Sequence, residues 1–242
     1  MIQPLRDLVR EILAESDHMN LPFLKALRDG TMSHEEFIET QVQFYSAVAF
    51  FASPMAVLAA RIHDESLREG ILRNVAEEGG EGDITKSHRA TFLEFIRRIG
   101  GPEGREVLRR PVWPEVKAFN AALSAICATD DHAVGAAVMG MIEAMFSGIS
   151  AAIGQGTVAR GWIAPDAMIH YDLHEELDVR HAEDFFKVVD VAWSDRAKRP
   201  HVERGLRLGV SLFSGLYAGL YAGRSRRSRN ESHANLQNKA GR

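Results

Sequence analysis

Hydrophobic residues recur at helical spacing along most of the chain, and no long stretch alternates as a β-strand would. After Ser33, the side chains of Phe37, Gln41, Phe44 and Val48 follow at intervals of three or four residues, the spacing of one helical face. Similar patterns predict helices at residues 3–17, 33–63, 64–78, 84–99, 114–129, 132–153, 167–194 and 201–222. The sequence therefore predicts an all-α fold consisting of a single helical bundle.

Local signals set several of the expected boundaries. Ser33 followed by Glu36 forms a capping-box pattern, which predicts a helix start at this point. Pro54 is expected to kink or split the helix that follows, because proline lacks an amide hydrogen. Glycines at 100–101 and 154–156 are typical of breaks between helices.

The last part of the chain differs in composition. Residues 223–242 contain one large aliphatic side chain, Leu236, among many arginine, serine and asparagine residues. Such a segment buries too little apolar surface to offset the entropy lost on ordering. We therefore expect a helical domain at residues 1–222 and a disordered, basic polar tail at 223–242.

Composition narrows the class of protein. With 242 residues, 45% of them hydrophobic, the chain is long enough for one domain with a sizeable core. The net charge of -4 gives no basic footprint for nucleic acid or an anionic membrane. Cys127 is the single cysteine, and the N-terminal residues do not resemble a signal peptide. We expect a cytoplasmic protein that binds neither nucleic acid nor membrane.

Three potential metal ligands lie on one stripe of the predicted helix at 167–194. Residues four and seven positions apart differ by about 400° and about 700° around a helix, so His174, Asp178 and His181 share a face. Two imidazoles and a carboxylate suit iron, manganese or zinc. The alternative is a solvated face, because charged residues such as Arg180 and Glu183 lie on the same helix.

A lone carboxylate interrupts the apolar helix predicted at 132–153. Glu143 stands among alanine, glycine, methionine and valine. A buried carboxylate needs a cation or an ion pair to offset its lost hydration, so Glu143 is either a metal ligand or the partner of a basic residue.

A third group lies in a glycine-rich segment. Glu81 and His88 are seven residues apart and would share one face of a regular helix, whereas Glu78 and His88 are ten apart. The spacing favours Glu81 as the partner of His88, with Glu78 as the alternative. An exposed acidic loop followed by a surface histidine is the remaining interpretation.

Taken in order, these three motifs resemble the haem-oxygenase-like di-iron oxidases, over roughly residues 20–215. The segment HEELDVRHA is especially similar to the subgroup of the chlamydial death-domain-associated protein, and fainter similarity extends to pyrroloquinoline quinone synthase and TenA-like proteins. The resemblance implies a bundle of seven to eight helices that holds two iron ions, or an iron–manganese pair, and forms a homodimer. Carried over position by position, the implied ligands are Glu81, His88, Glu143, His174, Asp178 and His181, with Glu78 as the alternative to Glu81.

The sequence also departs from that subgroup, whose p-aminobenzoate-forming members use tyrosines and a lysine as sacrificial reactants. The matching positions here are Phe23, Ile142, Ile153 and His170. The resemblance therefore does not imply self-sacrificing p-aminobenzoate synthesis.

The resulting hypothesis is an iron-dependent oxidoreductase that uses dioxygen and an external electron donor to oxidise a small organic substrate by N-oxygenation, desaturation or C–C cleavage. No catalytic residue beyond the metal ligands is predicted, and Gln41, Tyr45 and His170 are the candidates for the substrate pocket. The alternatives are a cofactor-independent oxidase resembling pyrroloquinoline quinone synthase and a non-catalytic helical ligand-binding or regulatory protein.

Overall fold

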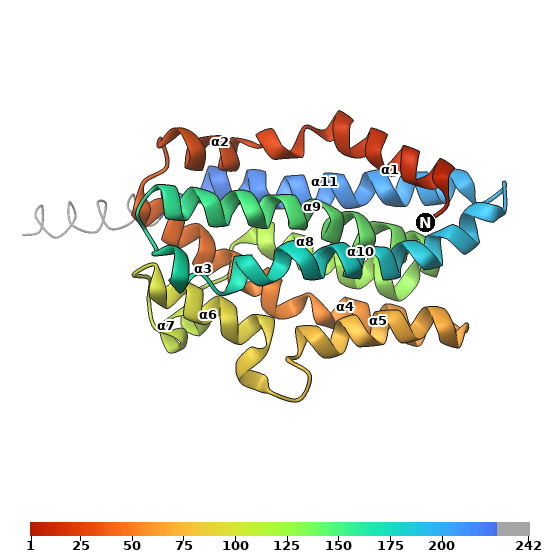
Figure 1. The fold of residues 1–242 in the computed structure, drawn as a ribbon, viewed down its shortest axis with the longest axis horizontal. Helices are drawn as coiled ribbons and strands as arrows, with labels where there is room; N and C mark the ends of the chain where they lie inside the picture. Colours follow the sequence, from red (N-terminus) through yellow and green to blue (C-terminus); the bar gives the residue numbers. More distant parts are fainter. Residues whose placement is uncertain (227–242) are drawn as a thin grey trace, which may run out of the picture.

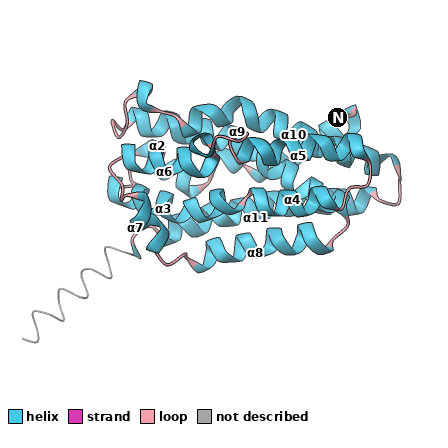
Figure 2. Ribbon diagram, turned by 90° about the horizontal axis from the view of Figure 1, so that it is seen from below, coloured by secondary structure: helices cyan, strands magenta, loops and turns pink. Residues whose placement is uncertain are grey.

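The computed structural model describes the backbone of residues 1–226 and the side chains of these residues except 172–178. Within this part of the chain the regular structure is helical and no β-strand occurs (Figure 2), which confirms the predicted all-α fold. The α-helices are α1 (Gln3–Ser16), α2 (Pro22–Asp29), α3 (His34–Phe50), α4 (Ala52–Ala60), α5 (Glu65–Glu78), α6 (His88–Arg98), α7 (Gly104–Arg109), α8 (Pro114–Thr129), α9 (His132–Ala159), α10 (His170–Ser194) and α11 (Arg199–Gly223). Short 3-10 turns occur at His18–Asn20, Ile84–Lys86 and Pro165–Ala167.

Most of the long helices run along the long axis of an elongated bundle (Figure 1). In that view α1 and α2 cover the top, α4 and α5 lie at the bottom, and α9, α10 and α11 run between them. Helix α9 packs against α10 and α11 along its length and also contacts α2, α4 and α8. This arrangement makes α9 the core helix, which explains why its sequence is apolar almost all round.

The predicted start and break of the α3–α4 segment are confirmed. Ser33 Oγ accepts a hydrogen bond from the Glu36 amide at 3.1 Å, and Glu36 Oε2 accepts one from the Ser33 amide at 3.0 Å. Helix α3 ends at Phe50 and α4 begins at Ala52. The break lies one turn before Pro54, whose nitrogen cannot donate to the carbonyl of residue 50.

Helix α9 is longer than predicted, because it continues through the glycines that we expected to end it. A Cβ atom at Gly156 would lie 2.8 Å from the side chain of Leu27, so this glycine allows α2 to pack closely on α9. Helices α2 and α7 were not predicted, because each is too short to show a clear hydrophobic period.

The prediction of a disordered tail at 223–242 falls mainly on residues outside the described part of the chain. The described residues after α11 are held by charged contacts. Arg226 pairs with Glu115 at 2.5 and 2.9 Å and its guanidinium lies 4.8 Å from the centre of the Trp113 ring. Arg224 lies 3.3 Å from Glu36, at the start of α3.

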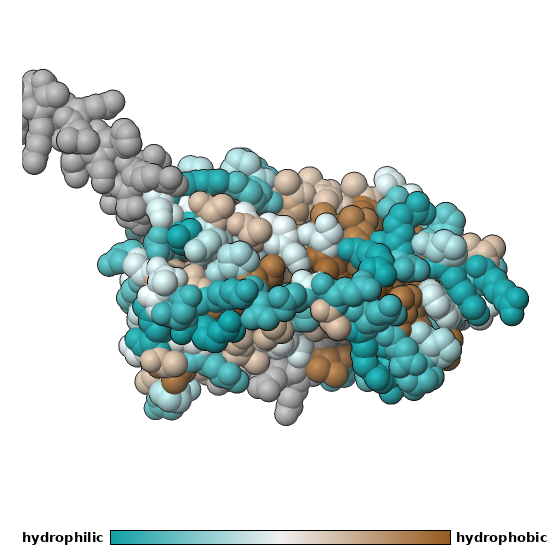
Figure 3. Space-filling model, turned by 90° about the horizontal axis from the view of Figure 1, so that it is seen from above, coloured by the Kyte–Doolittle hydropathy of each residue, from teal (hydrophilic) through white to brown (hydrophobic). Residues whose placement is uncertain are grey.

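Two stretches, His34–Ala60 and His132–Ala159, are long and apolar enough to cross a membrane by length and composition alone. In the second, 72% of the apolar window is buried inside the bundle, and in the first 50% is buried. Packing within the bundle therefore accounts for the apolar character of α9. The surface seen in Figure 3 is mostly polar, with hydrophobic residues in separate areas.

The close contact of α11 with α9 yields a stability prediction. A Cβ atom at Gly209 would lie 2.7 Å from the Val138 carbonyl oxygen, so Gly209→Ala should force the helices apart and lower the free energy of unfolding by about 1–3 kcal/mol. Gly215 is the matched control on the same helix, because no atom lies within 4 Å of its added Cβ. Gly215→Ala should raise stability by up to about 1 kcal/mol through helix propensity. Urea denaturation measures the free energy of unfolding of both variants. Equal changes in the two variants would contradict the packing argument.

Candidate metal centre

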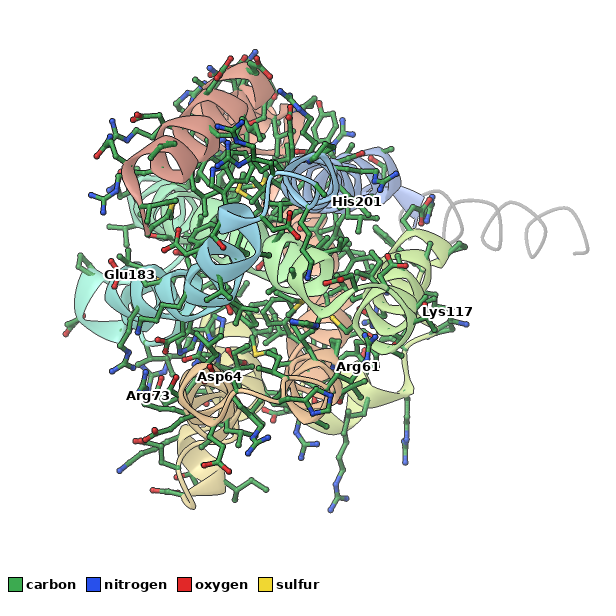
Figure 4. All side chains as sticks on the ribbon, turned by 90° about the vertical axis from the view of Figure 1, so that its right-hand side faces the viewer. Arg61, Asp64, Arg73, Lys117, Glu183 and His201 are labelled. Atoms are coloured by element: carbon green, nitrogen blue, oxygen red, sulfur yellow. The ribbon has the colours of Figure 1, made fainter. Side chains whose placement is uncertain are left out.

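Helices α5 and α10 are held against each other by an ion pair between a buried carboxylate and a partly exposed arginine. Asp184 of α10 is 1% exposed and lies 2.6 Å from Arg73 of α5 and 2.7 Å from Lys187. Burial alone would raise the pKa of Asp184, but the hydrogen bonds and charges of Lys187 and Arg73 lower it. Figure 4 shows Arg73 at the periphery of the bundle, on the same side as Glu183 of α10. The contact brings the C-terminal end of α5 alongside the middle of α10.

The first candidate ligands lie at two helix ends that face each other. Glu78 is the last residue of α5 and His88 is the first residue of α6. Both are buried, and His88 Nδ1 lies 2.7 Å from Glu78 Oε2. Ser87 caps α6 by accepting a hydrogen bond from the amide of Ala90, which fixes the position from which His88 projects.

The expectation that Glu81 shares a helix face with His88 is wrong. Helix α5 ends before Glu81, and the chain turns through Gly80, Glu81 and Gly82 with positive φ angles of 85°, 52° and 92°. Glu81 is exposed to solvent. The seven-residue spacing has no meaning across this turn, and Glu78, the alternative, is the carboxylate that lies beside His88.

The second group comes from the core helices. Glu143 of α9 is 2% exposed and His181 of α10 is fully buried. His181 Nδ1 lies 3.5 Å from Glu143 Oε1 and 3.9 Å from Glu78 Oε1. One ligand atom each from Glu78, Glu143 and His181 lie within 4.8 Å of one another, close enough to bind one metal ion. We call Glu78, His88, Glu143 and His181 the carboxylate–histidine cluster.

Two of the six implied ligands, His174 and Asp178, have side chains outside the described part of the structure. The backbone of α10 is helical from His170 to Ser194, as predicted, and it carries both residues and His181 on one continuous helix.

The charges around His181 favour a cation at its position. Burial by itself would lower the pKa of His181, yet the hydrogen bond and charge of Glu143, the hydrogen bond of Glu77 and the charge of Glu78 raise it to about 10. The cluster therefore attracts positive charge, which either a proton or a metal ion can supply.

Sequence reasoning missed Glu77. Its Oε2 atom lies 2.8 Å from His181 Nε2 and accepts a hydrogen bond from Arg180 at 2.6 Å. Thus His181 faces Glu78 and Glu143 with one ring nitrogen and Glu77 with the other. Adjacent helical residues point about 100° apart, so Glu77 and Glu78 reach different atoms. The packing of α5 on α10 shows that both glutamates contact the His181 ring.

A cavity of about 430 Å³, counted with the solvent at its open side, adjoins the carboxylate–histidine cluster. Its polar lining consists of Glu78, His88, Glu143 and His170. Its apolar lining consists of Phe44, Ala47, Val48, Phe51, Phe119, Ile142, Phe146 and Phe213. The cavity is therefore polar beside the carboxylate–histidine cluster and apolar elsewhere among the described residues.

The three pocket candidates have different positions. His170 lines the cavity as expected, and its Nδ1 atom lies 3.0 Å from Thr91 Oγ1. Gln41 instead accepts a hydrogen bond at 2.6 Å from the hydroxyl of Tyr171, a buried core contact. Tyr45 lines a separate surface pocket with Arg89. Neither Gln41 nor Tyr45 is among the residues that line the cavity.

The chain is similar to several known proteins. A 4-chloro-allylglycine synthase from Streptantibioticus cattleyicolor is 26% identical over 202 residues, which cover 76% of this chain and 70% of that protein. Among solved structures, a domain of unknown function with a haem-oxygenase-like fold from Shewanella denitrificans aligns with a TM-score of 0.76 and 18% identity, covering 92% of this chain and 94% of that one.

Two further structures show the same fold. A CADD-like protein from Nostoc punctiforme has a TM-score of 0.74 at 12% identity, with 91% of this chain and 96% of that chain covered. A TenA homologue from Pseudomonas syringae has a TM-score of 0.72 at 15% identity, with coverages of 90% and 91%.

The model of a family described as iron-containing redox enzymes matches residues 39–214, a span that includes the whole carboxylate–histidine cluster. This match covers well over half of the chain, and the helical bundle agrees with it. The chain belongs to the iron-containing redox enzyme family, and its fold is haem-oxygenase-like.

Proposed function

We propose that this protein is a non-haem di-iron oxygenase or oxidase that uses dioxygen to oxidise a small organic substrate. The observation that carries the proposal is the convergence of Glu78, Glu143 and His181, from three helices, with ligand atoms within 4.8 Å of one another in the interior. Membership of the iron-containing redox enzyme family supports the same conclusion.

The donor set fits iron. Carboxylates and imidazoles are common ligands of iron in oxygen-activating proteins, and bundle proteins recruit them from facing helices. The distances from His181 Nδ1 to Glu143 and Glu78, 3.5 and 3.9 Å, exceed those of strong hydrogen bonds and leave room for an ion between the three groups. When bound, ferrous iron would supply electrons and open coordination positions for dioxygen.

The residues of this chain divide the remaining tasks. Glu78 and Glu143 would offset the positive charge of the metals, and His88 and His181 would complete their coordination. His174 and Asp178, implied by the family resemblance, are the proposed further ligands for two irons or an iron–manganese pair. The apolar cavity would hold the substrate and keep bulk water out, and an external donor would provide electrons.

The similarity to a 4-chloro-allylglycine synthase supports an oxidative reaction on a small molecule. N-oxygenation, desaturation and C–C cleavage all remain within the proposal, because the groups that line the cavity do not select among them.

Anaerobic loading with ferrous iron tests the proposed function directly. The protein should bind about two irons per chain and develop a visible absorbance change on exposure to oxygen. His174→Ala and Asp178→Ala should each lower the iron content while the helix content measured by circular dichroism stays unchanged. A protein that binds no iron would instead support a cofactor-independent oxidase or a non-catalytic ligand-binding protein.

The two candidate glutamates at the glycine turn give a paired prediction. Glu78→Gln should remove at least one of the two irons, because it takes a buried carboxylate from the cluster. Glu81→Gln should leave iron content unchanged, because Glu81 is exposed on the turn. Iron analysis of both purified variants decides the matter, and a loss confined to Glu81→Gln would restore the spacing argument.

Glu77 is proposed as a positioning residue that acts through His181. Its hydrogen bond to Nε2 holds the ring so that Nδ1 faces the other two carboxylates. Such support of a ligand histidine typically changes metal affinity by about 10- to 100-fold.

Glu77→Ala should therefore weaken ferrous iron binding by about tenfold or more, and Glu77→Gln, which keeps an acceptor, should weaken it less. Arg180→Gln is the matched control, because it removes the other partner of Glu77 and leaves the hydrogen bond to His181. Competition with a chelator measures the affinity. Equal affinities of the wild type and Glu77→Ala would contradict the positioning role.

A further inference from the structure

The cavity beside the carboxylate–histidine cluster has two chemically different ends. At one end lie Glu78, His88, Glu143 and His170. The other walls are formed by phenylalanine, valine, isoleucine and alanine side chains, and Phe44, Phe146 and Phe213 pack there with ring centres 5.8 and 5.9 Å apart. Among the described residues, a ligand in this space meets polar side chains only where the metals are proposed to bind.

Among the described residues, no basic side chain lines the cavity. The two helices that supply most of its walls, α3 and α9, contain no lysine or arginine, and neither does the sequence of residues 172–178.

Two arginines of neighbouring elements, Arg61 and Arg89, are directed elsewhere. Arg61 donates to the carbonyls of Cys127 and Asp130 at 2.8 and 2.6 Å. Arg89 lines the separate surface pocket that contains Tyr45. A substrate carboxylate would therefore find a cation only at the metal end of the cavity.

The apolar end would also reject an ammonium group. Its walls offer no carboxylate or carbonyl acceptor in the described part of the chain, and phenylalanine rings are weaker partners for a cation than water or an acceptor oxygen. A charge placed there loses its hydration without a replacement.

We infer that the substrate is a small molecule with an apolar alkyl or aryl body and a single polar group, which is directed at the metals. This inference rests on the proposed function for the role of the metals, but the apolar end of the cavity can be tested without them. It separates this protein from enzymes whose substrates carry a second charged group far from the reacting position.

Three ligands with the same six-carbon chain test the inference by calorimetry on iron-loaded protein kept free of oxygen. Hexanoate should bind at least about tenfold more tightly than 6-aminohexanoate or hexanedioate, which place an ammonium or a carboxylate at the apolar end. If the dissociation constant of 6-aminohexanoate or of hexanedioate lies within about threefold of that of hexanoate, the inference is overturned, whatever the iron content.

A fourth ligand, 1-hexanol, is measured on metal-free protein. It should bind because the apolar end does not depend on iron, and failure to bind would overturn the inference. Binding of 1-hexanol by a protein that takes up no iron would instead refute the proposed function and leave the apolar cavity in place.

A variant at the rim of the cavity tests whether these ligands bind inside it. Phe51 is half-buried and lines the cavity, so we expect a polar residue at this position to keep contact with solvent. Phe51→Glu should improve binding of 6-aminohexanoate by about tenfold through a new ion pair, whereas Phe51→Gln, the neutral control, should not. An equal change in both variants would show that these ligands do not enter the cavity.

Discussion

The burial of carboxylates in an apolar interior is the constraint on which the centre of this bundle depends. Glu78 and Glu143 lie beside the buried ring of His181. An uncompensated buried carboxylate costs several kcal/mol, so the cluster requires positive charge from its own protons or from a bound cation. Against the effect of burial, Glu143, Glu77 and Glu78 raise the pKa of His181, which favours a positive charge at this ring.

The packing of the helices serves the same requirement. Helix α9 carries Glu143 through the centre of the bundle, and small residues such as Gly140 let α10 approach it closely, since a Cβ there would lie 3.1 Å from Phe185. The Arg73–Asp184 ion pair fixes α5 against α10. Ligands far apart in the sequence therefore meet because two tight helix contacts share α10.

The sequence predicted most of the helices and some residues of the candidate metal centre. Periodicity and capping determine where α3 begins, and a carboxylate in an apolar run, such as Glu143, needs a partner wherever it is buried. The choice between Glu81 and Glu78 could not be made in this way, because it depends on the backbone angles of a glycine turn. The contact of Glu77 with His181 and the positions of Gln41 and Tyr45 depend on which neighbouring helix covers each face, and a single-helix pattern contains no such information.

The turn between Glu78 and His88 also has a consequence for how this site tolerates change in evolution. A residue inserted beside Gly82, where an added Cβ would meet no atom within 4 Å, lengthens a solvent-exposed loop and leaves both flanking helix ends in place. The same insertion within α10 ahead of His181 would turn that ring by about 100° away from Glu143. Related chains can therefore differ in the length of the first ligand segment, whereas the spacing along α10 must stay fixed.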